Sequence, residues 1–180
     1  SSQTLTRFFD GEERTLLAGE AYDRNGDIDQ LSNIENIDGT EDDDIIIGDD
    51  DGDGIDNSFR GGAGNDTLIG GKGHDQIEGG EGNDQMHGDN EDWSGRDADD
   101  DDDGDEDDYY YDVLSYENET GGAGVTINVS TGTATDTYGD TDSFGGFEAY
   151  RGSQYADTFN GSIWDETFEG LAGNDTFYGG

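Results

Sequence analysis

The sequence predicts an all-β protein in which short strands and tight turns alternate to build a parallel β-roll. The first observation behind this prediction is a run of three nonapeptides over Gly61–His87: GGAGNDTLI, GGKGHDQIE and GGEGNDQMH. Each fits G-G-x-G-x-D-x-U-x, where U is a large apolar residue, and a fixed period indicates a solenoid. The second observation is that every repeat divides into a glycine-rich half, which suits a turn, and a three-residue extended half with one inward apolar side chain.

The third observation is the charge. The chain has 180 residues, 48 of them acidic and 7 basic, for a formal net charge of −41. Nucleic acid is excluded as a partner because phosphate binding needs clustered Lys and Arg. No apolar run is long enough to span a bilayer, and without cysteine no disulfide or thiolate–metal site can form. Since 28% hydrophobic residues with such a charge normally means disorder, we expect folding to require a multivalent cation.

The six-residue turn of each repeat, positions one to six, is called a corner here. Two repeats make one coil, so corners of repeats i and i+2 stack on the same side of the roll. Asp66 and Asp84, both at position six, should share one side, and Asp75 should lie on the other. Each stacked pair of corners then offers two carboxylates and several carbonyl oxygens, which suits Ca²⁺ and is poor for Zn²⁺, Cu²⁺ or Mg²⁺.

Energetics indicate that the ion is required for folding. Burying Leu68, Ile77 or Met86 contributes about 1.5–3 kcal/mol each. Ordering the backbone costs roughly 1–2 kcal/mol per residue, over nine residues for each such side chain. We therefore expect ion binding and folding to be one event, with a disordered chain in the absence of calcium.

The chain divides into five predicted parts. Residues 1–38 are a link segment, and 39–90 form a first roll that begins with two degenerate copies, Gly39–Ile47 and Gly48–Asp56, followed by a four-residue insert, Asn57–Arg60. This array is expected to end at the copy that begins at Gly88, because its position six is Trp93.

The second half repeats this plan. Residues 91–111 form an acidic insert around Asp99–Asp103, which like-charge repulsion should keep solvated. Residues 112–151 form a second link, with Val125–Val129 as a strand, and 152–180 begin a second roll. Gly11–Gly48 aligns without gaps with Gly124–Gly161 at a constant offset of 113 residues. Gly179-Gly180 would open a further repeat, so we expect the sequence to be a piece of a longer protein; no signal peptide is visible in residues 1–20.

These repeats resemble the RTX (repeats-in-toxin, haemolysin-type) calcium-binding modules of secreted bacterial proteins, and the segment GTATDTYGDTDSFGGFEAYRGSQYADTFNG at Gly132–Gly161 resembles the link between RTX arrays. The resemblance implies a right-handed parallel β-roll with several Ca²⁺ ions at its turns. It also implies export of the unfolded chain by a type I secretion system and folding outside the cell.

Carried over by residue, the resemblance assigns position-six ligands to Asp66, Asp75 and Asp84, with Asp44, Asp53, Asp157 and Asp175 as further candidates. In the repeat at Gly161, position six is Glu166, for which Asp165 could substitute. Tyr155 in the repeat at Gly152 and Trp164 in the repeat at Gly161 replace the fourth-position glycine and should crowd these corners. The remaining candidate residues are the corner positions that would supply carbonyl oxygens, together with two acidic residues of a degenerate copy: Gly61, Gly62, Ala63, Gly64, Gly70, Gly71, Lys72, Gly73, Gly79, Gly80, Glu81, Gly82, Asp49 and Asp51.

Other patterns leave alternatives open. Asp49, Asp51 and Asp53 match the start of an EF-hand loop, but position twelve would be Arg60 where a Glu is required, so an RTX corner is favoured. Asp136–Asp142, like Asp23–Asp29, is either a further ion site or a polar turn.

The histidines and aromatic residues complete the expectations. His74 and His87 are expected to face solvent. Phe159, Phe168 and Phe177 should form an inward ladder, while four other aromatic residues are expected to form an exposed strip or edge packing: Tyr150, Tyr155, Trp164 and Tyr178.

The predicted function is that of a secreted, extracellular, non-enzymatic module that binds several calcium ions, folds on binding them and stabilises neighbouring domains of the parent chain. No nucleophile–base arrangement or G-x-S-x-G turn is present. The alternative is a calcium-dependent carbohydrate-binding module whose partner is a polysaccharide, stacked on the exposed aromatic residues.

Overall fold

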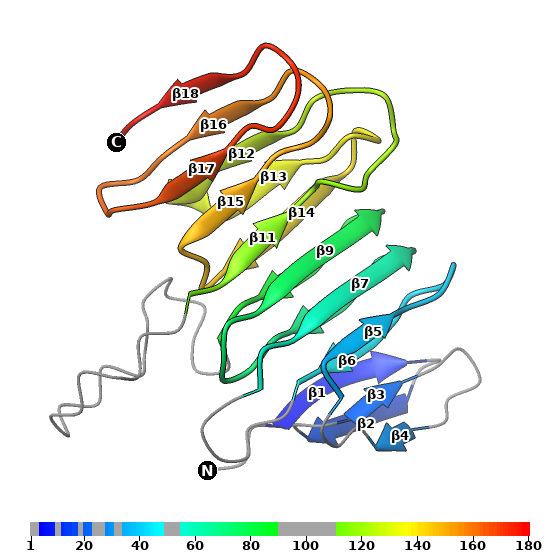
Figure 1. The fold of residues 1–180 in the computed structure, drawn as a ribbon. Coiled ribbons are helices and arrows are strands. Elements are labelled where there is room, and N and C mark those ends of the chain that lie inside the picture. The colour runs from blue at the N-terminus through cyan, green and yellow to red at the C-terminus, as the bar shows by residue number, and fades with distance from the viewer. Residues whose placement is uncertain are drawn as a thin grey trace, which may run out of the picture.

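The computed structural model describes residues 34–48, 55–89 and 111–180, and the backbone of four earlier strands, β1 (Thr4–Phe9), β2 (Glu12–Leu17), β3 (Glu20–Tyr22) and β4 (Ile28–Gln30). Within this part of the chain the regular structure is β-strand apart from one 3₁₀ turn, η1 (Val129–Thr131). The all-β prediction is therefore confirmed, and Figure 1 shows the strands stacked as successive coils.

Most strands are three residues long, which is the extended half of a nonapeptide. Beyond β4 they are β5 (Asn36–Asp38), β6 (Ile45–Ile47), β7 (Ser58–Ala63), β8 (Thr67–Ile69), β9 (Gln76–Glu81), β10 (Gln85–His87), β11 (Val113–Ser115), β12 (Thr126–Asn128), β13 (Thr133–Thr135), β14 (Thr141–Gly145), β15 (Ala149–Arg151), β16 (Thr158–Asn160), β17 (Thr167–Glu169) and β18 (Thr176–Tyr178). Apart from the β1–β2 hairpin they form a ten-stranded sheet, β18-β16-β12-β13-β14-β10-β8-β6-β3-β4, and a six-stranded sheet, β17-β15-β11-β9-β7-β5.

The register between strands is that of a β-roll. Leu68 of β8 pairs with Ile46 and Met86 in the larger sheet, and Ile77 of β9 pairs with Phe59 and Leu114 in the smaller one, always in parallel. The chain therefore alternates between the two sheets from one repeat to the next, as the nonapeptide period predicts.

Two sequence expectations about where the array is interrupted are wrong. Ser58 pairs with Gln76, so Ser58–Arg60 is the extended half of a repeat rather than an insert, and Asn57 takes position six. Val113 pairs with both Gln76 and Ala149, so the repeat that begins at Gly88 is completed by Asp112–Ser115 and the array does not end there. Both errors arose because more residues separate the first glycine of these repeats from the following strand than in the regular repeats, which a fixed nine-residue count cannot detect.

Among the described strands from β11 to β18, strand direction reverses only in the second link, at β13. β13 is antiparallel to both neighbours, β12 and β14. Its register with β14, Thr133 to Ser143, repeats the register of β3 with β4, Glu20 to Gln30, at the 113-residue offset found in the sequence. The surroundings of the two hairpins differ: β12 lies between β13 and β16, whereas β3 pairs directly with β6.

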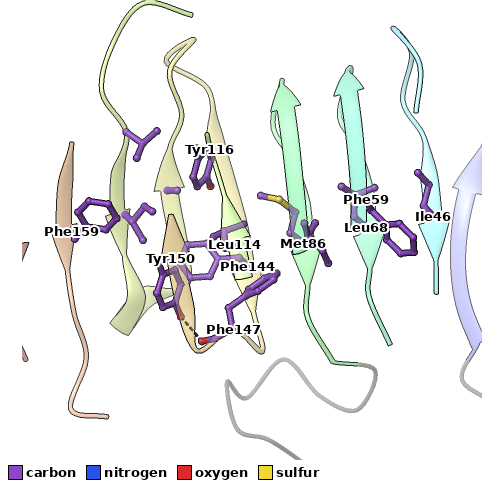
Figure 2. Close-up of a cluster of buried hydrophobic side chains, with 14 residues drawn as sticks. Ile46, Phe59, Leu68, Met86, Leu114, Tyr116, Phe144, Phe147, Tyr150 and Phe159 are labelled. Atoms are coloured by element: carbon purple, nitrogen blue, oxygen red, sulfur yellow. Dashed lines mark hydrogen bonds between the residues drawn. The ribbon is translucent and has the colours of Figure 1, made fainter. Parts of the chain in front are cut away.

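The core is a single stack of the inward side chains at position eight, drawn in Figure 2. Phe159 and Phe177 stack with ring centroids 4.9 Å apart, and Phe159 lies 5.2 Å from Phe168, which confirms the predicted ladder. Tyr150 was wrongly expected outside: it is 3% exposed, packs on Phe144, and its hydroxyl donates to the Phe147 carbonyl. It is buried because Ala149–Arg151 pairs with Val113–Ser115, which puts Tyr150 at position eight.

Candidate calcium site

The corner of the repeat at Gly61 shows why three glycines are needed. Gly62 and Gly64 have φ of +112° and +119°, a conformation that side chains disfavour. Gly61 is needed for space, since a methyl group there would lie 2.1 Å from Asp66 Oδ2 and 2.6 Å from the carbonyl oxygen of Gly79. A carboxylate oxygen and a carbonyl oxygen from two stacked corners therefore meet beside one glycine.

The position-six carboxylates form ladders along both sides of the roll. On one side Asp66 Oδ1 accepts the N–H of Asp44 at 2.8 Å, and Asp84 Oδ1 accepts that of Asp66 at 2.8 Å. On the other side Asp75 Oδ1 accepts the N–H of Asn57 at 2.7 Å, and Asp112 Oδ1 accepts that of Asp75 at 2.7 Å. One oxygen of each carboxylate is thus fixed by the neighbouring coil, which holds the second oxygen in a defined direction.

The second oxygen lies in the corner. Among the described residues, Oδ2 of Asp66, Asp75, Asp84 and Asp112 is buried and accepts no hydrogen bond. A buried carboxylate oxygen without a donor is costly unless a cation compensates it. At the corner glycines of Asp66, Asp75 and Asp112, a glycine carbonyl oxygen of the neighbouring coil lies near the carboxylate oxygen, and carboxylate and carbonyl oxygens are the ligands that calcium prefers, so the residues fit this ion.

The pKa values of the corner aspartates are raised, as expected for buried carboxylates that lack a compensating cation. Burial, with a further contribution from neighbouring carboxylates, raises the pKa of Asp66 to about 7, of Asp75 to about 8 and of Asp112 to about 10, from the ordinary 3.8. For Asp112 the strongest of these neighbouring charges is that of Asp75. Hydrogen bonds from backbone N–H groups lower the pKa but do not offset burial.

Side chains alone do not complete such a site. Within the described ranges, no three Asp, Glu or His side chains gather as a metal-binding group. An ion in a corner would therefore take most of its ligands from backbone carbonyls, which is the role that the glycines make possible.

Three degenerate corners hold their carboxylates differently. Asp44 Oδ2 accepts from the N–H of Thr40 at 2.6 Å and from its hydroxyl at 2.9 Å. Ser153 donates in the same way to Asp157, and Ser162 to Glu166. The residue at position two thus donates, through its backbone N–H and its hydroxyl, to the acid that glycine corners leave with one oxygen lacking a donor.

The other predicted ligands are placed as follows. Asp49, Asp51 and Asp53 lie outside the described residues, and position six of their repeat belongs to Asn57 instead of Asp53. Asp165 is exposed, and Glu166 takes position six before β17. The Asp175 carboxylate accepts the N–H of Asp157 at 3.0 Å and so continues the ladder.

Sequence reasoning did not assign two acids at position six. Asp112 was not assigned because more residues separate it from its corner glycine, Gly88, than in the other repeats, and Asp142 because it lies within β14 in the link, where its Oδ1 accepts the N–H of Asp84 at 3.0 Å. The parallel pairing of the residues that follow each of them identifies both. A second ladder at position five, in which Asn65 Oδ1 accepts the N–H of Asn83 at 3.1 Å, was also missed.

His74 is exposed as predicted, but His87 is not. His87 is 4% exposed, and its Nδ1 contacts the carbonyl oxygen of Asp89. It is buried because the end of β14 in the next coil, at Gly145 and Gly146, lies against its ring.

Comparison with known families supports the site just described. Residues 60–92 and 164–180 match the family model of the RTX calcium-binding nonapeptide repeat, in four copies. These segments are RTX repeats. RTX nonapeptide repeats bind several Ca²⁺ ions, and the repeat itself is a non-catalytic calcium-binding module. No curated protein matches the chain.

The matched residues agree with the geometry. The first matched segment contains the corners of Asp66, Asp75 and Asp84, whose Oδ2 atoms lack donors among the described residues. The resemblance stated from the sequence is therefore confirmed, and calcium is the ion of these repeats. In the described ranges no helix has the length and apolar character needed to cross a membrane.

Proposed function

We propose that this RTX module is a calcium-triggered folding unit of a secreted protein, with Ca²⁺ held at the corners of Asp66, Asp75, Asp84 and Asp112. The observation that carries the proposal is the set of buried Oδ2 atoms without donors in the described residues, each beside a corner glycine. A bound ion supplies the positive charge that these oxygens need and bridges carboxylates and carbonyls of successive coils. Thr40, Ser153 and Ser162 make the corners of Asp44, Asp157 and Glu166 less dependent on an ion.

The charge of the module supports an obligatory role for the ion. The charges acting most strongly on Asp66, Asp75 and Asp112 are all acidic. Arg151 instead pairs with Glu117 and Glu169 on the outer surface of the smaller sheet. Since the charges that act on the ladders are acidic, folding without calcium would bury like charges about one strand spacing apart.

The same property fits export. A chain that stays unfolded without calcium can pass through a narrow secretion channel and fold where calcium is plentiful. We extend the proposal accordingly to type I secretion, an extracellular location and stabilisation of neighbouring domains in the parent chain, with the five sequence segments as its organisation.

A calcium titration tests the folding role. Calorimetry and far-UV circular dichroism are followed in parallel from excess chelator to millimolar CaCl₂, and we expect heat release and β-sheet signal to rise together. A spectrum that is already β-rich in chelator, with calcium binding that leaves it unchanged, would refute the proposal.

The carbohydrate-binding alternative is less supported. Burial of Tyr150 removes one member of the expected aromatic strip, and Trp164 and Tyr178 remain exposed at 59% and 58%. A glycan array with and without chelator separates the two functions: calcium-dependent glycan signals would favour the alternative.

A further inference from the structure

A second group of buried acids lies in the link, away from the nonapeptide corners. The segment after β11 meets the turn between β13 and β14 at Thr137. The backbone N–H and hydroxyl of Thr137 donate to Glu119 Oε2 at 3.1 and 2.9 Å. Gly121 N–H donates to the Thr137 hydroxyl at 3.0 Å, so two separate segments of the link are held together around one carboxylate.

Asp136, the neighbour of Thr137, is fixed by its own turn. Its Oδ1 accepts the N–H groups of Tyr138, Gly139 and Asp140 at 3.0, 2.7 and 2.7 Å. Both acids are almost fully buried, Glu119 being 3% and Asp136 1% exposed. Each carboxylate therefore has one oxygen saturated with donors, as the corner aspartates do.

The other oxygen of each acid has no donor. Glu119 Oε1 and Asp136 Oδ2 are buried and accept no hydrogen bond from any described residue. By contrast, nearby Asp142 is fully satisfied, since Oδ1 accepts the N–H of Asp84 and Oδ2 the hydroxyl of Tyr116 at 3.0 Å. The charges acting most strongly on Glu119 are those of Asp136 and Asp142, so the surroundings add negative charge.

We propose that Glu119 Oε1 and Asp136 Oδ2 hold a further divalent cation of the calcium class, at a site in the link that is not a nonapeptide corner. Two buried carboxylate oxygens without donors suit a hard cation. Among the described residues no three acidic or histidine side chains lie close enough together to hold a metal ion. Backbone carbonyls and water would therefore supply the remaining ligands of this cation. Within the acidic stretch Asp136–Asp142, Asp136 would thus bind the ion together with Glu119 from a separate segment of the link.

This ion would couple the link to the roll. β13 is the antiparallel strand that joins β14 to β12, and Glu119 and Asp136 sit where it turns back. A cation bound between Glu119 and Asp136 would fix the β13–β14 hairpin against β10, the last strand of the larger sheet in the first array. The chain could then respond to calcium as one unit across the link rather than as two separate arrays.

Native mass spectrometry in CaCl₂ tests the site by counting ions. We expect Glu119→Gln and Asp136→Asn each to carry one ion fewer than the unaltered chain, and calorimetry to show at least tenfold weaker binding of that ion. Asp38→Asn removes an exposed carboxylate of the same charge outside the corners and should carry the full number. Equal ion counts and affinities in Glu119→Gln and the unaltered chain would overturn the inference.

A crystal of the unaltered chain grown in CaCl₂ keeps the test independent of how the variants fold. Anomalous density between Glu119 and Asp136 is expected. Density at the corners of Asp66 and Asp75 but none at the link overturns this inference alone, whereas a chain that binds no calcium at all refutes the proposed function.

Discussion

Asp66→Asn separates the two effects that the corner carboxylate has on folding: charge repulsion when calcium is absent and ion binding when it is present. The substitution keeps an oxygen to accept the N–H of Asp44 and replaces the buried oxygen without a donor by a neutral NH₂ group. Asp44 and Asp84 are among the charges that act on Asp66, one coil away on either side. At a strand spacing of about 4.8 Å and an effective dielectric near 20, each such pair repels by about 3 kcal/mol.

The variant should therefore change stability in opposite directions with and without calcium. In chelator its residual structure should increase, because at least one repulsion of this size is removed. In calcium it should need a higher ion concentration to fold, by at least the roughly 10–100-fold that loss of a supporting group costs a metal site.

Far-UV circular dichroism during a calcium titration measures both effects, with Asp38→Asn as the control for loss of one exposed charge. The reasoning fails if Asp66→Asn folds at the same calcium concentration as the unaltered chain. It fails equally if the variant is less structured in chelator, since the buried charge would then be stabilising.

Three further predictions follow from the same geometry. Burial raises the folded-state pKa values of Asp66, Asp75 and Asp84 to about 7, 8 and 6, so the folded chain binds protons that the unfolded chain releases. In chelator the residual β-structure should therefore be highest at acid pH and fall as pH rises towards 8; far-UV circular dichroism across a pH series measures this, and structure that increases with pH contradicts it. Gly61→Ala places a methyl group 2.1 Å from Asp66 Oδ2 and should abolish calcium binding at that corner by calorimetry, whereas Gly179→Ala, with nothing within 4 Å, should bind normally. Ser153→Ala removes the hydroxyl that donates to Asp157 Oδ1 at 2.7 Å and leaves the backbone N–H that donates to Oδ2, so the folded state without excess calcium should lose about 1–3 kcal/mol in thermal unfolding and recover part of this in calcium; an unchanged calcium dependence would show that the hydroxyl does not support this carboxylate.

The sequence was sufficient where the repeat period is unbroken. From Gly61 to His87 the nine-residue spacing places Leu68, Ile77 and Met86 inward and Asp66 and Asp84 on one side, because the chain has one regular way to coil. The 113-residue offset likewise anticipated that β3–β4 and β13–β14 share a register.

Sequence reasoning failed where turn length varies. A turn can gain residues without disturbing the strands beside it, so counting nine residues misplaces whatever follows. Asn57, Asp112 and Tyr150 were missed or misplaced for this reason, and parallel pairing with the neighbouring coil assigns them. The pairing of Glu119 with Asp136 also needed the structure, since two segments that are separate in sequence build it.

Anomalous diffraction from crystals grown in calcium tests the central claim most directly. The account predicts ions at the corners of Asp66, Asp75 and Asp84, within the usual distance of about 2.3–2.6 Å from a carboxylate oxygen and from glycine-turn carbonyls. An intact roll with no ion beside these aspartates would contradict it.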